Sequence, residues 1–426
     1  MIFSQNKQKY AFILGQVPAL SKAEIAAVLN HQNIEFAELF SDDHVLVIES
    51  KKLSADELQE RLGGTIKISN FQLTISKKFP IPPALLREAG QANSQFIDKI
   101  FKLVIKRFKD LKIKDKKFQF GFSVYGELNQ KALQKIGLEI KRHLQSKKIK
   151  SRLVVSKEPA LSSVIVQKEK LIDQGVDIVI IPSAEEYYIG YTVSVQKFAE
   201  YSERDYGRPQ RDDKSGMLPP KLAKMMFNLS QTDFNQTILD PFCGSGTVIQ
   251  EAIFLGYKKI IGSDISDKAV SDTLNNLEWL KTKFRQDLAG VKIFKQDVRE
   301  LFKKIQRQSI DCIVTEPYLG PVRANSNLQD TSYKKDQRSK IQDPNIIYEL
   351  SKLYLTAFEE FYKVLRKEGK IVVIFPIING QKLEILNDIK RLGFVTEPIG
   401  PEPRKSIIYS RPQQRVKREI FVFRKI

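Results

Sequence analysis

Asp-Pro-Phe-Cys-Gly-Ser-Gly-Thr, residues 240–247, lies between an apolar, strand-like segment (237–239) and a helix-like segment (248–255). A strand that stops at Asp and Pro, turns through two glycines and enters a helix forms the ligand crevice of a doubly wound sheet. Glycine lets the backbone approach a ligand without a Cβ atom in the way, and the helix start supplies free N–H groups. The stretch therefore predicts a Rossmann-like sheet with a binding site at the carboxyl ends of its strands.

Two further aspartates close apolar segments downstream. Asp264 ends the segment 260–264, 24 residues after Asp240, and Asp297 follows the segment 291–296. A carboxylate at an offset of ~20 residues can accept hydrogen bonds from ribose hydroxyls. The glycine spacing is not the G-x-G-x-x-G of dinucleotide sites, so the pattern favours a nucleoside ligand without a pyrophosphate, namely S-adenosylmethionine. The alternative for each aspartate alone is a strand-end or helix-capping carboxylate.

Length and composition indicate a cytoplasmic, multidomain protein. A chain of 426 residues exceeds one ordinary domain. The longest apolar run, 371–378, is far shorter than the ~18 residues that a membrane span needs. The first residues lack the layout of a signal peptide. Two cysteines and three histidines argue against a disulfide framework and a metal cluster, so we expect no metal ligands.

The net charge of +20 favours a polyanionic partner, and the basic residues are clustered. Nine Lys and Arg fall in 98–117, seven in 141–157 and eight in 404–425, and a long polar loop at 319–343 holds five more. Each run alone is also compatible with a solvated helix face, whereas several together favour nucleic acid. The candidate RNA-binding residues are Lys106, Arg107, Arg142, Lys147, Lys148, Arg152, Arg323 and Arg411.

The pattern of strands and helices divides the chain into four parts. Residues 1–78 have the βαββαβ order of a ferredoxin-like unit, with a helix expected at 21–31. Residues 79–196 read as a small α+β module, in which we expect a strand at 163–167. The polar segment 197–216 reads as a linker. Residues 217–426 alternate strands and helices, which predicts a parallel sheet covered on both faces.

Aromatic residues in the strand-like segment 118–125 have two interpretations. Phe118, Phe120 and Phe122 alternate with smaller residues, as the core-facing positions of a strand do. Aromatic rings beside basic residues can instead stack on unpaired bases. The alternation favours the core.

Several motifs together resemble one known family. Residues 240–247, Arg-Asp-Tyr-Gly-Arg-Pro (204–209), Met-Leu-Pro-Pro-Lys-Leu-Ala (217–223) and the C-terminal stretches 407–412 and 416–420 resemble the THUMP-domain tRNA methyltransferases. Among these, the chain is most similar to the group that makes N2-methylguanosine at position 10 of tRNA. The resemblance implies a class I, Rossmann-like methyltransferase domain with a mostly parallel seven-stranded sheet, preceded by ferredoxin-like and THUMP-like RNA-binding domains.

The resemblance also implies roles for the residues around the glycine turn. Asp240, Gly244 and Gly246 would line the methionine part of S-adenosylmethionine, Asp264 would accept from the ribose hydroxyls, and Asp297 would meet the adenine amine. The full set of candidate cofactor-binding residues is Pro219, Asp240, Phe242, Cys243, Gly244, Gly246, Thr247, Asp264, Ile265, Asp297 and Val298.

The fourth strand of this domain ends in Thr-Glu-Pro-Tyr, residues 315–318, which are the candidate catalytic residues Thr315, Glu316, Pro317 and Tyr318. Amino-group methyltransferases resembling this chain place Asp, Asn or Ser, then Pro-Pro, then Tyr or Phe here. An acceptor at this place offsets charge that develops on the amine, and positioning supplies most of the rate. The sequence departs from that pattern and leaves three alternatives: Glu316 supplies the carboxylate, backbone carbonyls and Thr315 hold the amine, or catalysis is lost.

The expected function is S-adenosylmethionine-dependent methyl transfer to the exocyclic N2 of a guanosine in tRNA, at position 10. The base would be extruded from its helix to reach the site, and the loop 319–343 would fold over it. The alternatives are a DNA amino-methyltransferase and a catalytically inactive RNA-binding protein that retains the cofactor fold. The expected partner is tRNA, and we expect no membrane association. The sequence leaves open whether a small activating protein subunit is required. We expect a monomer or weak dimer.

Overall fold

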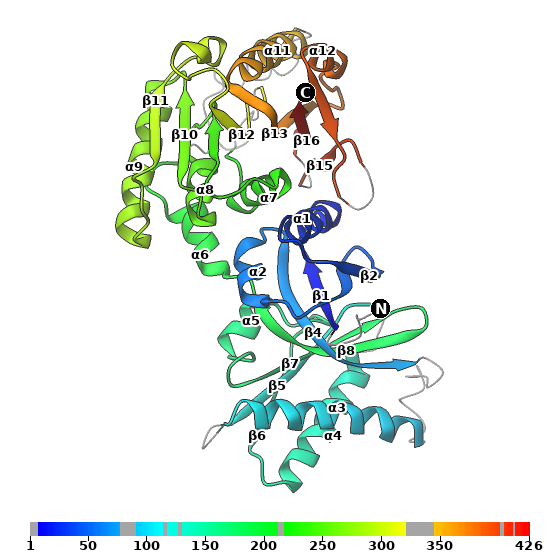
Figure 1. The fold of residues 1–426 in the computed structure, drawn as a ribbon. Coiled ribbons are helices and arrows are strands. Elements are labelled where there is room, and N and C mark those ends of the chain that lie inside the picture. Colours follow the sequence, from blue (N-terminus) through cyan, green and yellow to red (C-terminus); the bar gives the residue numbers. More distant parts are fainter. Residues whose placement is uncertain are drawn as a thin grey trace, which may run out of the picture. The chain divides into compact units, whose positions relative to one another are not determined.

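A computed structural model describes residues 7–76, 91–113, 117–126, 130–211, 217–320, 345–400, 404–411 and 414–426. The chain forms two compact units (Figure 1). The first is drawn from residues 1–18, 33–60 and 65–198, and the second from residues 19–32, 61–64 and 199–426.

The first part of the chain has the expected ferredoxin-like strand order. The elements are β1 (Gln8–Leu14), α1 (Pro18–His31), β2 (Phe36–Ser41), β3 (Val45–Ser50), α2 (Ala55–Arg61) and β4 (Thr65–Ser76). The strands lie in the order β2-β3-β1-β4, and each neighbouring pair is antiparallel. The βαββαβ prediction is therefore confirmed.

The same sheet continues into the next part of the chain. Its further elements are α3 (Gln91–Asp110), β5 (Phe118–Val124), α4 (Gln130–Ser146), β6 (Ser151–Val154), α5 (Ser163–Lys168), β7 (Gly175–Pro182) and β8 (Glu186–Val195). β4 pairs antiparallel with β8, so one eight-stranded sheet runs β2-β3-β1-β4-β8-β7-β5-β6. The division at residue 78 stays a prediction about folding units, since the strands on either side share this sheet.

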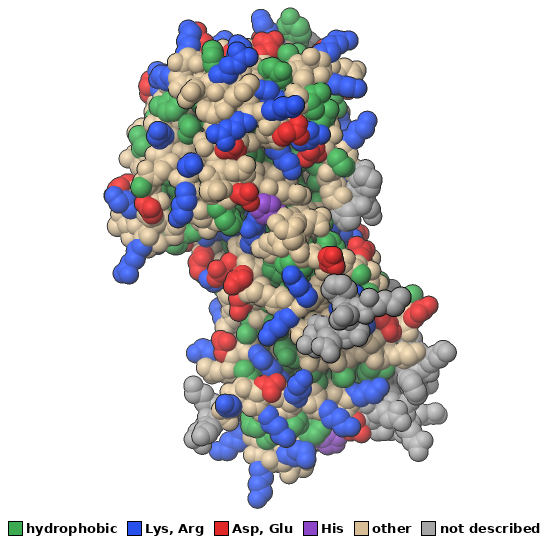
Figure 2. Space-filling view, viewed as in Figure 1, with side chains coloured by type: hydrophobic (Ala, Val, Ile, Leu, Met, Phe, Trp, Pro, Cys, Tyr) green, Lys and Arg blue, Asp and Glu red, His purple; other side chains and the backbone are tan. Residues whose placement is uncertain are grey.

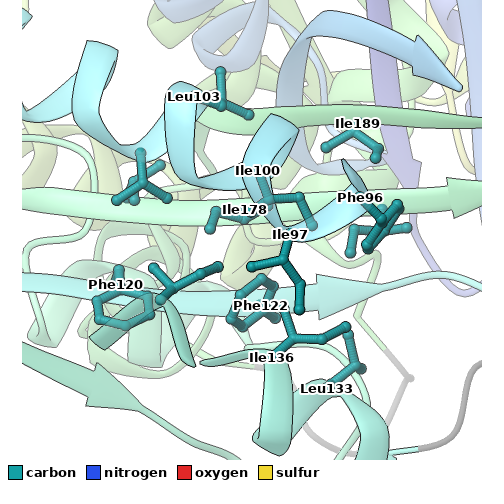
Figure 3. Packing of buried hydrophobic residues seen from close by; sticks show 14 of the residues in the cluster. Phe96, Ile97, Ile100, Leu103, Phe120, Phe122, Leu133, Ile136, Ile178 and Ile189 are labelled. Atoms are coloured by element: carbon teal, nitrogen blue, oxygen red, sulfur yellow. The ribbon is translucent and has the colours of Figure 1, made fainter. Parts of the chain in front are cut away.

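Helices α3 and α4 pack on this sheet through one apolar cluster. In Figure 3, Ile97 of α3 lies beside Phe122 of β5, Ile100 lies near Ile178 of β7, and Phe96 lies near Ile189 of β8. Phe118 and Phe120 are fully buried. The core interpretation of these aromatic residues is therefore correct, and their rings do not face a bound base.

One expected strand is a helix. Residues 163–168 form α5, and the Ser162 side chain caps it by accepting a hydrogen bond from the Ile165 N–H. The β-branched residues in Ser-Val-Ile-Val favour a strand by propensity, but the cap satisfies a backbone donor of the first turn and Val166 is buried. Tertiary burial decides over local propensity here.

The second unit contains a mixed sheet of the expected type. Its strands are β9 (Thr237–Asp240), β10 (Lys259–Asp264), β11 (Val291–Lys295), β12 (Ile310–Thr315), β13 (Leu365–Ile378), β14 (Phe394–Glu397), β15 (Ile407–Tyr409) and β16 (Val416–Lys425). They run β11-β10-β9-β12-β13-β16-β14, parallel from β11 to β13, with β16 antiparallel to both its neighbours. The short β15 pairs with β16 and adds an eighth strand to the seven expected.

Helices connect these strands: α7 (Pro220–Ser230), α8 (Thr247–Leu255), α9 (Asp267–Phe284), the 3-10 helix η3 (Val298–Lys303), α11 (Ile346–Val364) and α12 (Leu386–Arg391). The chain starts this sheet at β9 and adds strands on one side through β10 and β11, then on the other side from β12. The strand order thus reverses at β9. In open α/β sheets, ligands bind outside the carboxyl ends of the strands at such a reversal.

The segment 198–211, which precedes this sheet, is held in place by two buried arginines. It forms α6 (Phe198–Ser202) and the π-helix η2 (Glu203–Gly207). Arg204 Nε donates to Glu251 of α8 at 2.7 Å, and Arg208 Nη1 donates to the Thr247 hydroxyl at 2.7 Å. Both arginines are buried. The polar composition that suggests a linker over 197–216 therefore includes side chains packed against α8, while residues 212–216 lie outside the described ranges.

Across the described ranges, no helix is long and apolar enough to cross a bilayer. In the same ranges, no three or more His, Cys, Asp or Glu side chains gather where they could hold a metal ion.

Candidate active site

A cavity of about 580 Å³ opens at the carboxyl ends of β9, β10, β11 and β12. Most of the residues singled out by sequence line it. These are Asp240, Phe242, Cys243, Gly244, Thr247, Asp264, Ile265, Asp297, Val298, Glu316, Pro317 and Tyr318. Pro219, Gly246 and Thr315 are not among its lining residues, but each contacts or adjoins one that is.

The glycine turn after β9 needs both of its glycines, for different reasons. Gly244 and Gly246 have φ angles of +52° and +84°, which L-residues adopt with strain. A Cβ on Gly246 would lie 3.0 Å from Thr273, so this glycine permits close packing onto α9. A Cβ on Gly244 would meet no atom within 4 Å, because this backbone faces the cavity. Gly244 therefore leaves room for a ligand.

Asp264, at the end of β10, joins the two neighbouring turns. Its Oδ2 accepts from the Gly244 N–H at 3.1 Å and its Oδ1 accepts from the Ser266 N–H at 3.0 Å. The carboxylate is thereby fixed at the cavity wall.

Asp240 is buried at the end of β9 and is held by Thr315. The Thr315 hydroxyl donates to Asp240 Oδ1 at 2.7 Å, and the Phe242 N–H donates to the same oxygen at 3.2 Å. Burial raises the pKa of Asp240 to about 7, and the charges of Asp264 and Glu316 add to the rise. Thr315 itself is fully buried. The structure therefore places Thr315 as a support for Asp240 rather than at the cavity surface.

Glu316, Pro317 and Tyr318 of the fourth-strand motif reach the cavity, and Glu316 and Tyr318 carry its polar and aromatic side chains there. Glu316 accepts from Arg418 of β16, with Nε to Oε1 at 2.6 Å and Nη2 to Oε2 at 3.4 Å. Burial raises the pKa of Glu316, and the adjacent Arg418 guanidinium opposes that rise. Tyr318 is 53% exposed and lines the cavity. The cavity is thus lined by a hydrogen-bond acceptor, Glu316, and by an aromatic residue, Tyr318, two positions apart in the chain.

Asp297 follows β11 and caps the helix η3, and its carboxylate accepts hydrogen bonds from Arg299 of that helix. Arg299 Nε donates to both carboxylate oxygens at 3.0 Å, and the hydrogen bonds from Arg299 lower the pKa of Asp297. The carboxylate remains ionised and lines the cavity. It can accept from an amine at that wall.

Several lining residues were not singled out by sequence. They include Met217, Leu218, Lys268, Asp272, Arg299 and Leu353. Met217 and Leu218 immediately precede Pro219, so the motif at 217–223 was the signal that pointed to them. Asp272 and Leu353 lie inside α9 and α11, where helix periodicity gives no sign of which face meets a cavity.

The residues present fit S-adenosylmethionine. Asp240, Asp264 and Glu316 make the cavity acidic, which suits a ligand with a sulfonium and an ammonium. The space beside Gly244 admits backbone approach, and Asp264 and Asp297 lie at the ends of successive strands, as a ribose and an adenine require.

The candidate RNA-binding residues lie mainly in the first unit. Figure 2 shows many Lys and Arg side chains over the region of α3 and α4. Arg107 Nη2 donates to the Ile172 carbonyl at 2.6 Å, and Arg152 pairs with Glu169 at 3.0 Å, so both also have structural partners. Lys106 lies on α3, Arg142 on α4, and Lys147 and Lys148 directly after α4, whereas Arg411 follows β15 in the second unit. Arg323 and most of the loop 319–343 lie outside the described residues.

The chain is similar to known methyltransferases in sequence. Residues 208–334 match the family model described as the RMKL-like methyltransferase domain. The tRNA (guanine(10)-N2)-dimethyltransferase of Methanocaldococcus jannaschii is 32% identical over 137 residues, which cover 30% of this chain and 38% of that protein. The probable tRNA (guanine(10)-N2)-dimethyltransferase of Methanothermococcus thermolithotrophicus is 35% identical over 112 residues, 26% of this chain and 67% of that protein. The aligned part spans less than half of the Methanocaldococcus protein.

Fold comparison agrees with this relationship. The crystal structure of TrmN from Thermus thermophilus matches with a TM-score of 0.56 and 14% identity, over 98% of this chain and 100% of that one. This likeness concerns the fold, which is that of class I methyltransferases. The relatives in sequence show that this chain belongs to the family of tRNA (guanine-N2)-methyltransferases, and residues 208–334 form its RMKL-like methyltransferase domain.

Proposed function

We propose that this protein transfers a methyl group from S-adenosylmethionine to the exocyclic N2 of a guanosine in tRNA, at position 10. The observation that carries the proposal is the acidic cavity in which Asp240 and Asp264 meet Glu316 and Tyr318. Two relatives are named as a tRNA (guanine(10)-N2)-dimethyltransferase and a probable one, which supports the same atom and position. We further propose that residues 79–196 act as a THUMP-like RNA-binding part and that the protein works in the cytoplasm.

The cofactor, when bound, supplies an electrophilic methyl group on a sulfonium. Asp240 would attract its ammonium, Asp264 would accept from its ribose hydroxyls, and Asp297 would accept from its adenine amine. The turn at Gly244 would let backbone N–H groups approach. These residues bind and orient, and positioning of two reactants contributes most of the rate.

At the other side of the reaction, Tyr318 and Glu316 would hold the base. The half-open Tyr318 ring can stack on it, and Glu316 can accept from the amine and offset the charge that develops there. Lys106, Arg142, Lys147 and Lys148 would contact phosphates, which adds affinity without sequence information. We propose the same role for Arg107, Arg152 and Arg411. For Arg323, which lies outside the described residues, this role rests on the sequence alone.

The test is mass spectrometry of tRNA incubated with the purified chain and S-adenosylmethionine, both as nucleosides, which identify the modification, and as ribonuclease fragments, which locate it. We expect N2-methylguanosine at position 10 from the chain alone. Methylation only after a second subunit is added would show that the activating partner is required. Equal methylation of duplex DNA would favour the DNA amino-methyltransferase alternative, and tRNA binding without methylation would support the binding-only alternative.

Gly244→Ala tests the cofactor site directly. The added methyl group would project into the cavity, so we expect S-adenosylmethionine affinity to fall by about tenfold or more, in line with about 1–3 kcal/mol for overfilling a packed site. Isothermal titration calorimetry measures this affinity. The left-handed backbone adds about 1 kcal/mol of strain.

Gly256→Ala is the matched control for that strain. Gly256 has a φ of +96° and equal open space, but it caps the far end of α8 and is not among the cavity's lining residues. We expect a comparable stability loss with unchanged cofactor affinity. Equal affinity in both variants would contradict the placement of the cofactor beside Gly244.

A further inference from the structure

The carboxylate of Glu316 forms an ion pair with Arg418, a residue outside the fourth-strand motif. Arg418 belongs to β16, where it pairs with Pro376 of β13 and Tyr409 of β15, and its side chain is 5% exposed. Glu316 is 13% exposed and lines the cavity, whereas Arg418 is not among the lining residues. The guanidinium therefore contacts the carboxylate from the protein side and leaves its other side toward the cavity.

This arrangement fixes the orientation of Glu316 and favours its ionised form. The guanidinium donates through Nε and Nη2 to different carboxylate oxygens, a fork that sets the plane of the acid. A carboxylate has about four lone-pair positions, so each oxygen keeps acceptor capacity. Burial favours the neutral acid, and the fixed positive charge of Arg418 works against that. With the guanidinium on both oxygens, the ionised group accepts hydrogen bonds and donates none.

An acceptor-only group distinguishes among the bases that carry an exocyclic amine. Guanine presents two adjacent donors, N1–H and the N2 amine, and both can be received by the two carboxylate oxygens. Adenine and cytosine present an amine next to a ring nitrogen with a lone pair, which a carboxylate repels. Sites built around hydrogen bonds discriminate strongly, because the wrong ligand leaves buried polar groups unpaired.

We propose that Arg418 is a positioning residue that fixes Glu316 as an acceptor-only group, and that this carboxylate selects guanine over adenine and cytosine at the transfer site. The inference rests on the proposed function, since it concerns the base held for methyl transfer. It also accounts for the departure of Thr-Glu-Pro-Tyr from the usual motif: the acid stands one residue later, where a strand-borne arginine can hold it.

The first experiment measures base selectivity in wild type and Glu316→Gln. A glutamine amide offers one acceptor and one donor, which matches adenine and mismatches guanine N1–H. We expect guanosine methylation in tRNA to fall on the order of 100-fold or more, and the ratio of N2-methylguanosine to N6-methyladenosine to fall with it. Calorimetry should still show S-adenosylmethionine binding, which confirms a folded site. A Glu316→Gln protein that keeps the guanosine preference of wild type overturns the inference.

The second experiment separates positioning by Arg418 from a purely structural role. In Arg418→Met no cation opposes the burial of Glu316, so the acid limb of its pH–rate profile should move to higher pH, while Arg418→Lys restores part of the wild-type profile. The rates are measured at saturating S-adenosylmethionine, so that the nearby Asp240, whose pKa burial raises to about 7, is held ionised by the cofactor. An Arg418→Met protein whose activity falls equally at every pH, with an unmoved profile, contradicts the positioning role.

Free nucleosides test the inference apart from catalysis. Saturation-transfer NMR with guanosine and adenosine should show that wild type prefers guanosine and that Glu316→Gln loses this preference. If wild type prefers guanosine but methylates none in tRNA, the proposed function fails while the selectivity stands. If wild type methylates guanosine in tRNA but Glu316→Gln prefers guanosine over adenosine as strongly as wild type, the proposed function stands and the selective role of Glu316 fails.

Discussion

Asp240→Asn is expected to weaken S-adenosylmethionine binding on the order of 100-fold, because removing one partner of a buried charged contact costs about 2–5 kcal/mol. Asparagine keeps the size of the side chain and an oxygen that can accept from Thr315 and from the Phe242 N–H. The fold should therefore survive, and the lost affinity reports the missing charge. Equilibrium binding of the cofactor to both proteins measures the effect.

The same variant should remove a pH dependence. With a pKa of about 7, Asp240 is largely neutral below that pH in the free protein and ionises above it. A cationic ligand binds the ionised form, so wild-type affinity should rise between about pH 6 and 7.5, by up to about tenfold per unit below the pKa, with proton release on binding. Asp240→Asn should show a flat profile.

Thr315→Val provides the matched control for this assignment. It removes the hydroxyl that stabilises the ionised form of Asp240, so its affinity profile should shift to higher pH without becoming flat. A wild-type profile as flat as that of Asp240→Asn would falsify the role of Asp240 as the cationic-ligand acceptor.

Lys67→Met is expected to destabilise the first unit by about 3–5 kcal/mol, the range for breaking a buried ion pair by removing one partner. Lys67 of β4 is 1% exposed and donates to Asp177 of β7 at 3.1 Å, to Ser123 of β5 at 3.1 Å and to the Leu161 carbonyl at 2.9 Å. Asp177 also accepts from the hydroxyls of Ser123 and Thr192. Without Lys67, its charge stays buried and uncompensated.

Native-state hydrogen–deuterium exchange at β5 and β7 measures this loss in the unit concerned. The single tryptophan, Trp279, lies on α9 of the second unit, so its fluorescence reports that unit and should not change. Lys67→Met/Asp177→Asn should be more stable than Lys67→Met, since the amide carries no charge, its oxygen still accepts from one hydroxyl and its NH2 group can donate to the other. A double variant less stable than the single one would contradict this account.

Much of the second unit's binding site could be predicted from local sequence. Asp240, Asp264 and Asp297 each end an apolar segment, and parallel strands bring their carboxyl ends to one edge of a sheet. The glycine turn could be recognised because residues other than glycine adopt positive φ angles only with strain, so such a turn is marked by glycines in the sequence. The ferredoxin-like order followed from the periodicity of 1–76 in the same way.

Other features depended on contacts that no local pattern records. The strand expected at 163–167 is the helix α5, because a side-chain cap and burial of Val166 decide over β-branched propensity. The pairing of β4 with β8 joins segments more than a hundred residues apart into one sheet. Arg204 and Arg208 read as linker charges and are buried partners of Glu251 and Thr247.

By itself, the sequence determined the type of sheet, the place of its ligand crevice and the residues that end its strands, because these follow from periodicity and turn chemistry over a few residues. Only the tertiary structure decided what those residues do. Thr315 turned out to support Asp240, and Glu316 turned out to be held by Arg418, 102 residues away along the chain. Hydrogen bonding and burial between distant strands set the direction and charge of a side chain, and neither can be read from its neighbours in sequence.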